Sequence, residues 1–107
     1  MLYKFKSKAA GDVIMLAASG DRVLRILGRE PAAQGILEVA DLPAAMHAIE
    51  AAVVQDEQAR QDAEIEAAAQ GTPLPPREAV TLRQRAWPLL EMMRRCHAAR
   101  SDIVWGV

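Results

Sequence analysis

The sequence is poor in the residues that most often carry chemistry. Its 107 residues include one cysteine and two histidines, and aromatic side chains make up 4% of the chain. A single cysteine, Cys96, forms no internal disulfide and cannot by itself hold a structural zinc ion. We therefore expect a protein of the reducing cytoplasm that is not built around disulfides or a zinc core.

The chain also has few glycines, a small net charge and only short apolar runs. The six glycines stand apart from one another and form none of the glycine-rich loops that hold nucleotide phosphates. The formal net charge of −1 gives the chain no field that attracts nucleic acid or an anionic membrane. The opening residues alternate apolar and basic side chains, unlike a signal peptide, and the apolar run at residues 13–18 is far too short to cross a bilayer. We expect neither a membrane segment nor a targeting segment.

The remaining composition is that of one globular domain. Apolar residues make up 51% of the chain and charged residues 25%, and the length suits a single domain over residues 1–107. Alanine, the strongest helix former, is abundant, which favours a helix-rich protein.

Two strands are predicted at the start of the chain. Over residues 2–7, Tyr3 and Phe5 point one way, whereas Lys4 and Lys6 share the other face with Leu2, which is the period-two pattern of a half-buried strand. The short branched run at residues 13–16 predicts a buried second strand. Together they predict a hairpin with a long loop.

The next segment leaves one alternative open. Residues 20–27 follow capping residues around Ser19 and end at Gly28 and Pro31, which predicts a short helix. Alternation within the same residues also fits a strand. Residues 31–40 are predicted to be a connecting segment with turn residues at both ends.

Asp41 is predicted to cap the longest helix, with Pro43 tolerated in the first turn because no backbone donor is lost there. Its apolar stripe ends near Val54. Residues 55–79 are predicted to be an acidic helical extension followed by a proline-rich linker, since carboxylates far outnumber the basic residues in the helical part.

The last helix opens with Thr81 and Gln84, the pattern of a capping box. Residues at 100° intervals place one continuous apolar face on it, and Trp87 is expected to pack with that face onto the hairpin. A short apolar strand, residues 103–107, follows. We therefore predict an α+β fold in the order β-β-α-α-α-β, a small mainly antiparallel sheet of the N-terminal hairpin plus the C-terminal strand, covered by three helices on one face.

The chain also resembles a known family. The opening residues 1–9, the Gly-Asp-Val-Ile-Met-Leu block at residues 11–16, the loop at residues 27–36, the stretch at residues 82–92 and the closing residues 104–107 are similar to those of a family of small proteobacterial proteins catalogued as a domain of unknown function. The resemblance covers most of residues 1–54 and 80–107. It implies the fold boundaries but brings no activity, cofactor or catalytic residue.

No constellation of residues predicts catalysis. Cys96 lies in the apolar stripe of the last helix, and the adjacent His97 points about 100° away, so the two do not converge as a nucleophile and its base. His47 lies at the flank of the long helix with no further ligand at a suitable spacing. We expect a protein that is not an enzyme and that has no cofactor and no metal site.

The remaining signal concerns contact with other molecules. Arg83, Trp87 and Arg94 share one flank of the last helix, with Arg95 displaced around it, and we predict these four residues as an interaction surface together with the acidic extension. The leading hypothesis is a protein–protein contact with an unknown partner, and a homodimer formed through the long helix or the sheet edge. The alternative is a small-ligand or nucleic-acid binding module that uses the arginine-rich helix or the loop at residues 29–35, with nucleic acid the less favoured ligand.

Overall fold

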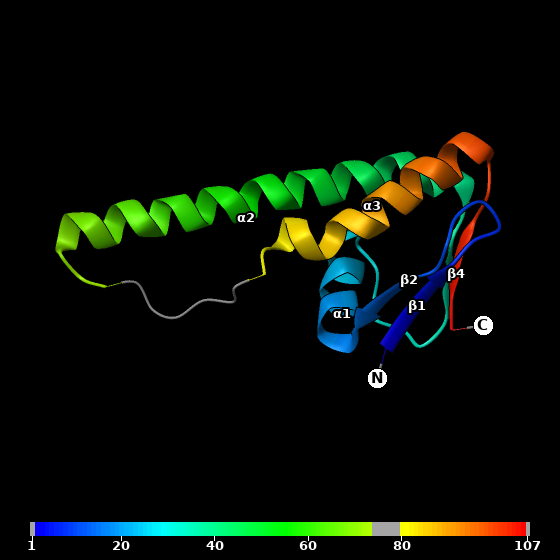
Figure 1. The fold of residues 1–107 in the computed structure, drawn as a ribbon, viewed down its shortest axis with the longest axis horizontal. Coiled ribbons are helices and arrows are strands. Elements are labelled where there is room, and N and C mark those ends of the chain that lie inside the picture. Colours follow the sequence, from blue (N-terminus) through cyan, green and yellow to red (C-terminus); the bar gives the residue numbers. More distant parts are fainter. Residues whose placement is uncertain (1, 74–79, 107) are drawn as a thin grey trace.

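The computed structural model describes residues 2–73 and 80–106 of the chain. Within these ranges it contains a four-stranded antiparallel sheet and three α-helices, so the fold is α+β, as predicted. The elements in chain order are β1 (Leu2–Lys6), β2 (Val13–Leu16), α1 (Ala17–Ile26), β3 (Gly35–Leu37), the 3-10 helix η1 (Val39–Asp41), α2 (Leu42–Gln70), α3 (Leu82–Ala99) and β4 (Ile103–Trp105). Figure 1 shows α2 and α3 side by side along one side of the sheet.

The two ends of the chain meet inside the sheet. The strand order is β2-β1-β4-β3, and each neighbouring pair is antiparallel. Phe5 of β1 stands opposite Trp105 of β4, which also stands opposite Gly35 of β3. This confirms the predicted pairing of the C-terminal strand with the N-terminal hairpin, and it makes β4 an interior strand.

Strand β3 lies where the sequence predicts a connecting segment, and that prediction is wrong for Gly35–Leu37. Three residues are too few to show a period of two, and the strand begins with a glycine, a poor strand former. Pairing with β4 creates β3: Ile36 stands opposite Val104 and Leu37 opposite Ile103. Leu37 is thereby buried beneath the helices.

Residues 20–27, which fit both a helix and a strand, belong mostly to helix α1. The helix begins earlier than predicted, at Ala17, directly after β2. Ser19 therefore lies inside the first turn and is not its cap; its hydroxyl accepts a hydrogen bond from Arg85 at 3.2 Å. Gly28 follows the helix with φ 77°, the left-handed conformation predicted to end it.

Helix α2 runs without a break from Leu42 to Gln70, so the acidic extension is a continuation of the long helix. Pro43 lies in its first turn, as predicted. The carboxylate of Asp41 does not cap α2; it turns back to accept a hydrogen bond from the Glu38 amide at 3.1 Å. None of residues 54–73 is buried. The rest of the predicted proline-rich linker, residues 74–79, lies outside the described residues.

Helix α3 begins with the predicted capping box. The Gln84 amide donates to the Thr81 hydroxyl at 3.2 Å, and the Thr81 amide donates to the Gln84 side-chain oxygen at 2.9 Å. Trp87 does not pack onto the hairpin: it is 42% exposed and lies against α2. The buried face of α3 contains Ala86 and Leu90, and Trp87 lies about 100° around the helix from Ala86.

The core lies between the helices and one face of the sheet. Phe5 is fully buried there, with its ring 6.0 Å from that of Tyr3 and 5.7 Å from that of Trp105. Alternate residues of the strands point to the opposite face, and several of these are large, apolar and exposed, namely Leu2, Ile14, Leu16 and Ile36. The helices therefore cover one face of the sheet and leave the other to solvent.

Candidate functional site

The structure brings together three of the four residues predicted as an interaction surface. The guanidinium carbons of Arg83 and Arg94 lie 5.9 and 5.1 Å from the centre of the Trp87 ring. Both arginines also reach α2, where Arg83 pairs with Glu57 at 2.6 Å and Arg94 pairs with Glu50 at 3.4 Å. We call these five residues the Trp87 clasp.

The clasp joins α3 to α2. Because the two helices run antiparallel, Arg83 near the start of α3 meets Glu57, and Arg94 near its end meets Glu50. The hydrogen bond and the charge of Glu57 raise the pKa of Arg83 above its ordinary value. Exposed ion pairs and cation–π contacts are screened by solvent and contribute little to stability. The charges of these two arginines are therefore paired within the chain, which uses much of the positive charge that a phosphate would need.

Arg95 is not part of the clasp. It is exposed and lies one residue after Arg94, about 100° around the helix. Glu50 is the clasp residue that sequence analysis missed, because it lies before the acidic extension. The signal for it was its spacing of seven residues from Glu57, which places both carboxylates on one side of α2.

The two histidines and the cysteine differ in their exposure to solvent. Cys96 is fully buried in the core, as its place in the apolar stripe predicts, whereas the adjacent His97 is exposed. His47 is exposed on α2. Within residues 2–73 and 80–106, no three histidine, cysteine or acidic side chains gather in a way that could hold a metal ion.

The uncovered face of the sheet is a surface that sequence analysis did not single out. We call it the outer face; its side chains are those of Leu2, Lys4, Lys6, Ile14, Leu16, Ile36 and Val104. The register places Leu2 opposite Leu16, beside Ile14, and these side chains are 60%, 63% and 59% exposed. These three residues form an apolar end of the outer face.

The other end of the outer face is basic. A hollow of about 570 Å³ is bordered there by Lys6, Lys8 and Arg100, and Ile36 and Val104 also line it. We call this the cationic hollow. Two carboxylates also line it, but each has another contact: Asp12 pairs with Lys4 at 3.5 Å, and Asp102 accepts a hydrogen bond from the Val39 amide at 2.9 Å. Three cations therefore stand beside one carboxylate, Asp102, whose charge no ion pair of the described residues neutralises, so the hollow presents an excess of positive charge beside an apolar surface.

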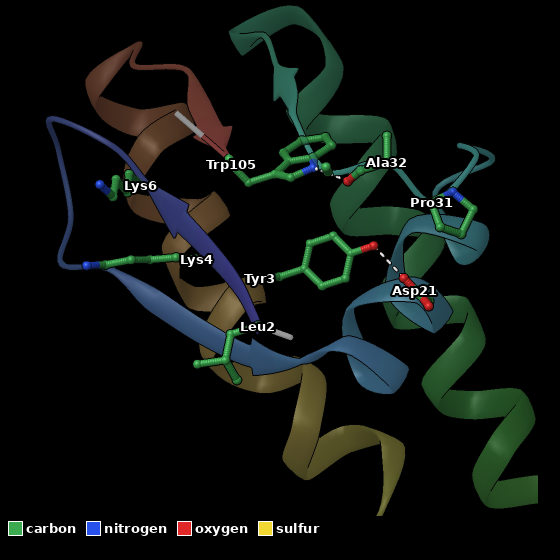
Figure 2. A pocket seen from close by; sticks show the side chains of 10 residues that line it. Leu2, Tyr3, Lys4, Lys6, Asp21, Pro31, Ala32 and Trp105 are labelled. Atoms are coloured by element: carbon green, nitrogen blue, oxygen red, sulfur yellow. Dashed lines mark hydrogen bonds between the residues drawn. The ribbon is translucent and has the colours of Figure 1, made fainter.

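A second hollow, of about 410 Å³, lies between β1, α1 and the loop before β3 (Figure 2). The Tyr3 hydroxyl donates a hydrogen bond to Asp21 across it, and the Trp105 indole N–H donates to the Ala32 carbonyl at 3.0 Å. Figure 2 shows Lys4 and Lys6 pointing away from Tyr3, toward the outer face. The first of these hydrogen bonds ties α1 to the sheet, and the second ties the loop before β3 to it.

The loop at residues 29–35, the alternative ligand site predicted from the sequence, is held by contacts with its own chain. Arg29 pairs with Asp41 at 3.4 Å, and the side-chain amide of Gln34 donates to the Gly106 carbonyl at 2.9 Å. These contacts give the loop a structural role next to β4.

Replacing Tyr3 with phenylalanine is expected to lower the free energy of unfolding by about 1 kcal/mol at neutral pH, because Asp21 loses its hydrogen-bond donor. The hydrogen bond to Asp21, with a smaller contribution from burial, raises the pKa of Tyr3 above its ordinary value of 10.0. Unfolded chains lose this proton first, so stability falls as the pH rises through about 10. Urea unfolding at neutral and alkaline pH should show a shallower alkaline fall for Tyr3→Phe; an equally steep fall would contradict this assignment.

Comparison with known proteins identifies a family and no closer relative. Among the described residues, no helix has both the length and the apolar content needed to cross a membrane. No curated protein and no solved structure matches the chain. The family described as Domain of unknown function (DUF1840) matches residues 1–105, nearly the whole chain, which confirms the resemblance seen in its sequence blocks. The chain therefore belongs to this family.

Proposed function

We propose that this is a non-catalytic cytoplasmic protein that acts through protein–protein contact, and that it self-associates through the outer face of the sheet. The observation that carries the proposal is the apolar end of that face, where Leu2, Ile14 and Leu16 stand together at about 60% exposure. Large apolar side chains gathered on one uncovered surface are typical of an interface. The Trp87 clasp is a weaker candidate for the interface, because its charges already pair within the chain.

A second copy of the chain suits this face in both energy and charge. Fully burying a leucine or isoleucine side chain stabilises a contact by roughly 1.5–3 kcal/mol, so one apolar end contributes several kcal/mol. The basic part of the face favours an acidic partner, and the chain itself carries clustered carboxylates on the second half of α2. Two-fold dimers, in which both copies use the same surfaces, are the commonest oligomers.

The proposal that the protein is non-catalytic and cytoplasmic is supported by the place of its cysteine. The Cys96 thiol is fully buried, out of reach of a substrate, and the adjacent His97 faces solvent. A lone buried thiol suits a reducing compartment. The protein is therefore best tested as a binding protein.

Replacing Ile14 with aspartate is expected to convert the dimer into a monomer, because the change places a carboxylate in the middle of the apolar contact. Sedimentation velocity at micromolar concentrations measures the change in mass. Ile14 is 59% exposed, so the monomer should keep its fold, which circular dichroism checks.

The matched control is Val80→Asp, which adds the same charge at an exposed apolar residue outside the sheet. This control should remain dimeric. A wild-type chain that is monomeric at micromolar concentrations in light scattering would contradict the proposed function.

A further inference from the structure

We propose that the cationic hollow of each copy receives the acidic end of helix α2 from a second copy, so that two chains clasp each other reciprocally. This inference rests on the proposed function, because it names the part of the partner that occupies the outer face. We call residues 61–70 the acidic arm. They contain three carboxylates and no basic residue.

The acidic arm extends beyond the rest of the fold. Figure 1 shows the end of α2 projecting past α3 and the sheet, and the molecule is 52 Å long but 28 and 22 Å across. No residue of the arm is buried, and Ile65 is 61% exposed. A helix that extends into solvent with a large apolar side chain at its surface suits a partner chain.

The arm presents its charges and its isoleucine on one side. Asp62, Ile65 and Glu66 occupy positions i, i+3 and i+4, which are neighbours on a helix surface. Asp62 accepts a hydrogen bond from Gln58 at 2.9 Å, and Glu66 accepts one from Gln70 at 3.2 Å. These are neutral partners, and no ion pair between described residues involves either carboxylate. The negative charge of this side is therefore available to a cation on another chain.

The cationic hollow complements this side of the arm. Its rim carries Lys6, Lys8 and Arg100, and no ion pair within the described part of the chain uses their head groups. Its apolar lining, Ile36 and Val104, offers a contact for Ile65 between the two carboxylates. Two charge pairs and one apolar contact fix both the position and the direction of the arm.

Geometry requires that the arm come from another copy. The arm lies at one end of the molecule, whereas the β1–β2 loop and the end of α3, which border the hollow, lie at the other (Figure 1). A chain therefore cannot fill its own hollow. A two-fold arrangement lets each copy give one arm and receive one, which doubles every contact.

The test uses two charge-reversed chains. The hollow variant is Lys6→Glu with Lys8→Glu, and the arm variant is Asp62→Lys with Glu66→Lys. For each variant alone, sedimentation equilibrium is expected to show a dissociation constant of the homodimer raised by about tenfold or more, because every docked arm meets like charge. Mixing the two variants is expected to restore dimerisation, since the acidic arm of one then meets the basic hollow of the other, and the reversed arm meets the reversed hollow.

Controls separate this inference from the proposed function. Arg25→Glu reverses an exposed cation of α1, outside the hollow, and should leave the dimer unchanged. Raising the salt concentration should weaken the wild-type dimer, since exposed charge pairs are screened. If Ile14→Asp abolishes the dimer while the mixed variants fail to associate, the outer face remains the interface and the arm inference is overturned. If the wild-type chain is monomeric, the proposed function itself fails.

Discussion

Replacing Phe5 with alanine is expected to lower the free energy of unfolding by about 3–5 kcal/mol, the largest effect of any single change considered for this chain. Phe5 is fully buried at the point where β1 pairs with both β2 and β4. Its ring stacks on Tyr3 and meets Trp105 at an interplanar angle of 60°. Alanine would remove these contacts and leave a cavity between the sheet and the helices.

The matched control is Lys4→Ala in the same strand. Lys4 is half-exposed on the outer face and pairs with Asp12 at 3.5 Å, so its loss is expected to change stability by no more than about 0.5 kcal/mol. Urea unfolding followed by circular dichroism measures both variants at neutral pH. Equal losses for the two changes would show that the inner face of β1 is not the core of the fold.

This contrast between the faces of β1 was predictable from the sequence, because a period of two is visible even in five residues. Tyr3 and Phe5 point inward, and Leu2, Lys4 and Lys6 point outward, as the alternation indicated. The capping box at Thr81 and Gln84 was predictable for a similar reason, since its chemistry lies within four neighbouring residues. Features whose cause is local can be predicted from the sequence alone.

Strand β3 and the start of α1 were not predictable in this way. Gly35–Leu37 becomes a strand because β4, nearly seventy residues later in the chain, supplies its hydrogen-bonding partner. Helix α1 begins at Ala17 because β2 ends directly before it, and no side-chain cap marks the boundary. For β3, pairing with β4 outweighs a weak local preference.

The candidate site also has a part that local spacing predicts and a part that depends on tertiary packing. Positions at 100° intervals placed Arg83, Trp87 and Arg94 on one flank of α3, and the structure brings them together. The pairing of Glu50 with Arg94 and the exposure of Leu16 depend on which elements pack together, and the sequence pattern does not predict that packing. A surface that consists of what the helices leave uncovered becomes visible only after the helices have been placed.

Replacing Gly35 with alanine is expected to destabilise the fold by about 2–3 kcal/mol, although it adds one methyl group. A Cβ atom built at Gly35 would overlap the ring of Trp105, which is 2% exposed and has no room to move away. The Trp105 indole N–H also donates to the Ala32 carbonyl at 3.0 Å, so displacing the ring breaks that hydrogen bond. Urea unfolding should show the loss as a lower midpoint with an unchanged slope.

Gly11→Ala provides the control, because a Cβ atom at Gly11 meets nothing within 4 Å. That change is expected to be neutral or to stabilise the chain by up to about 1 kcal/mol, since alanine reduces the freedom of the unfolded state. A double-mutant cycle with Trp105→Leu then identifies the cause. If the ring is the obstacle, the double variant loses less stability than the sum of the single variants, by about 1 kcal/mol or more. Strictly additive losses would instead place the strain in the backbone of β3, independent of its neighbour in β4.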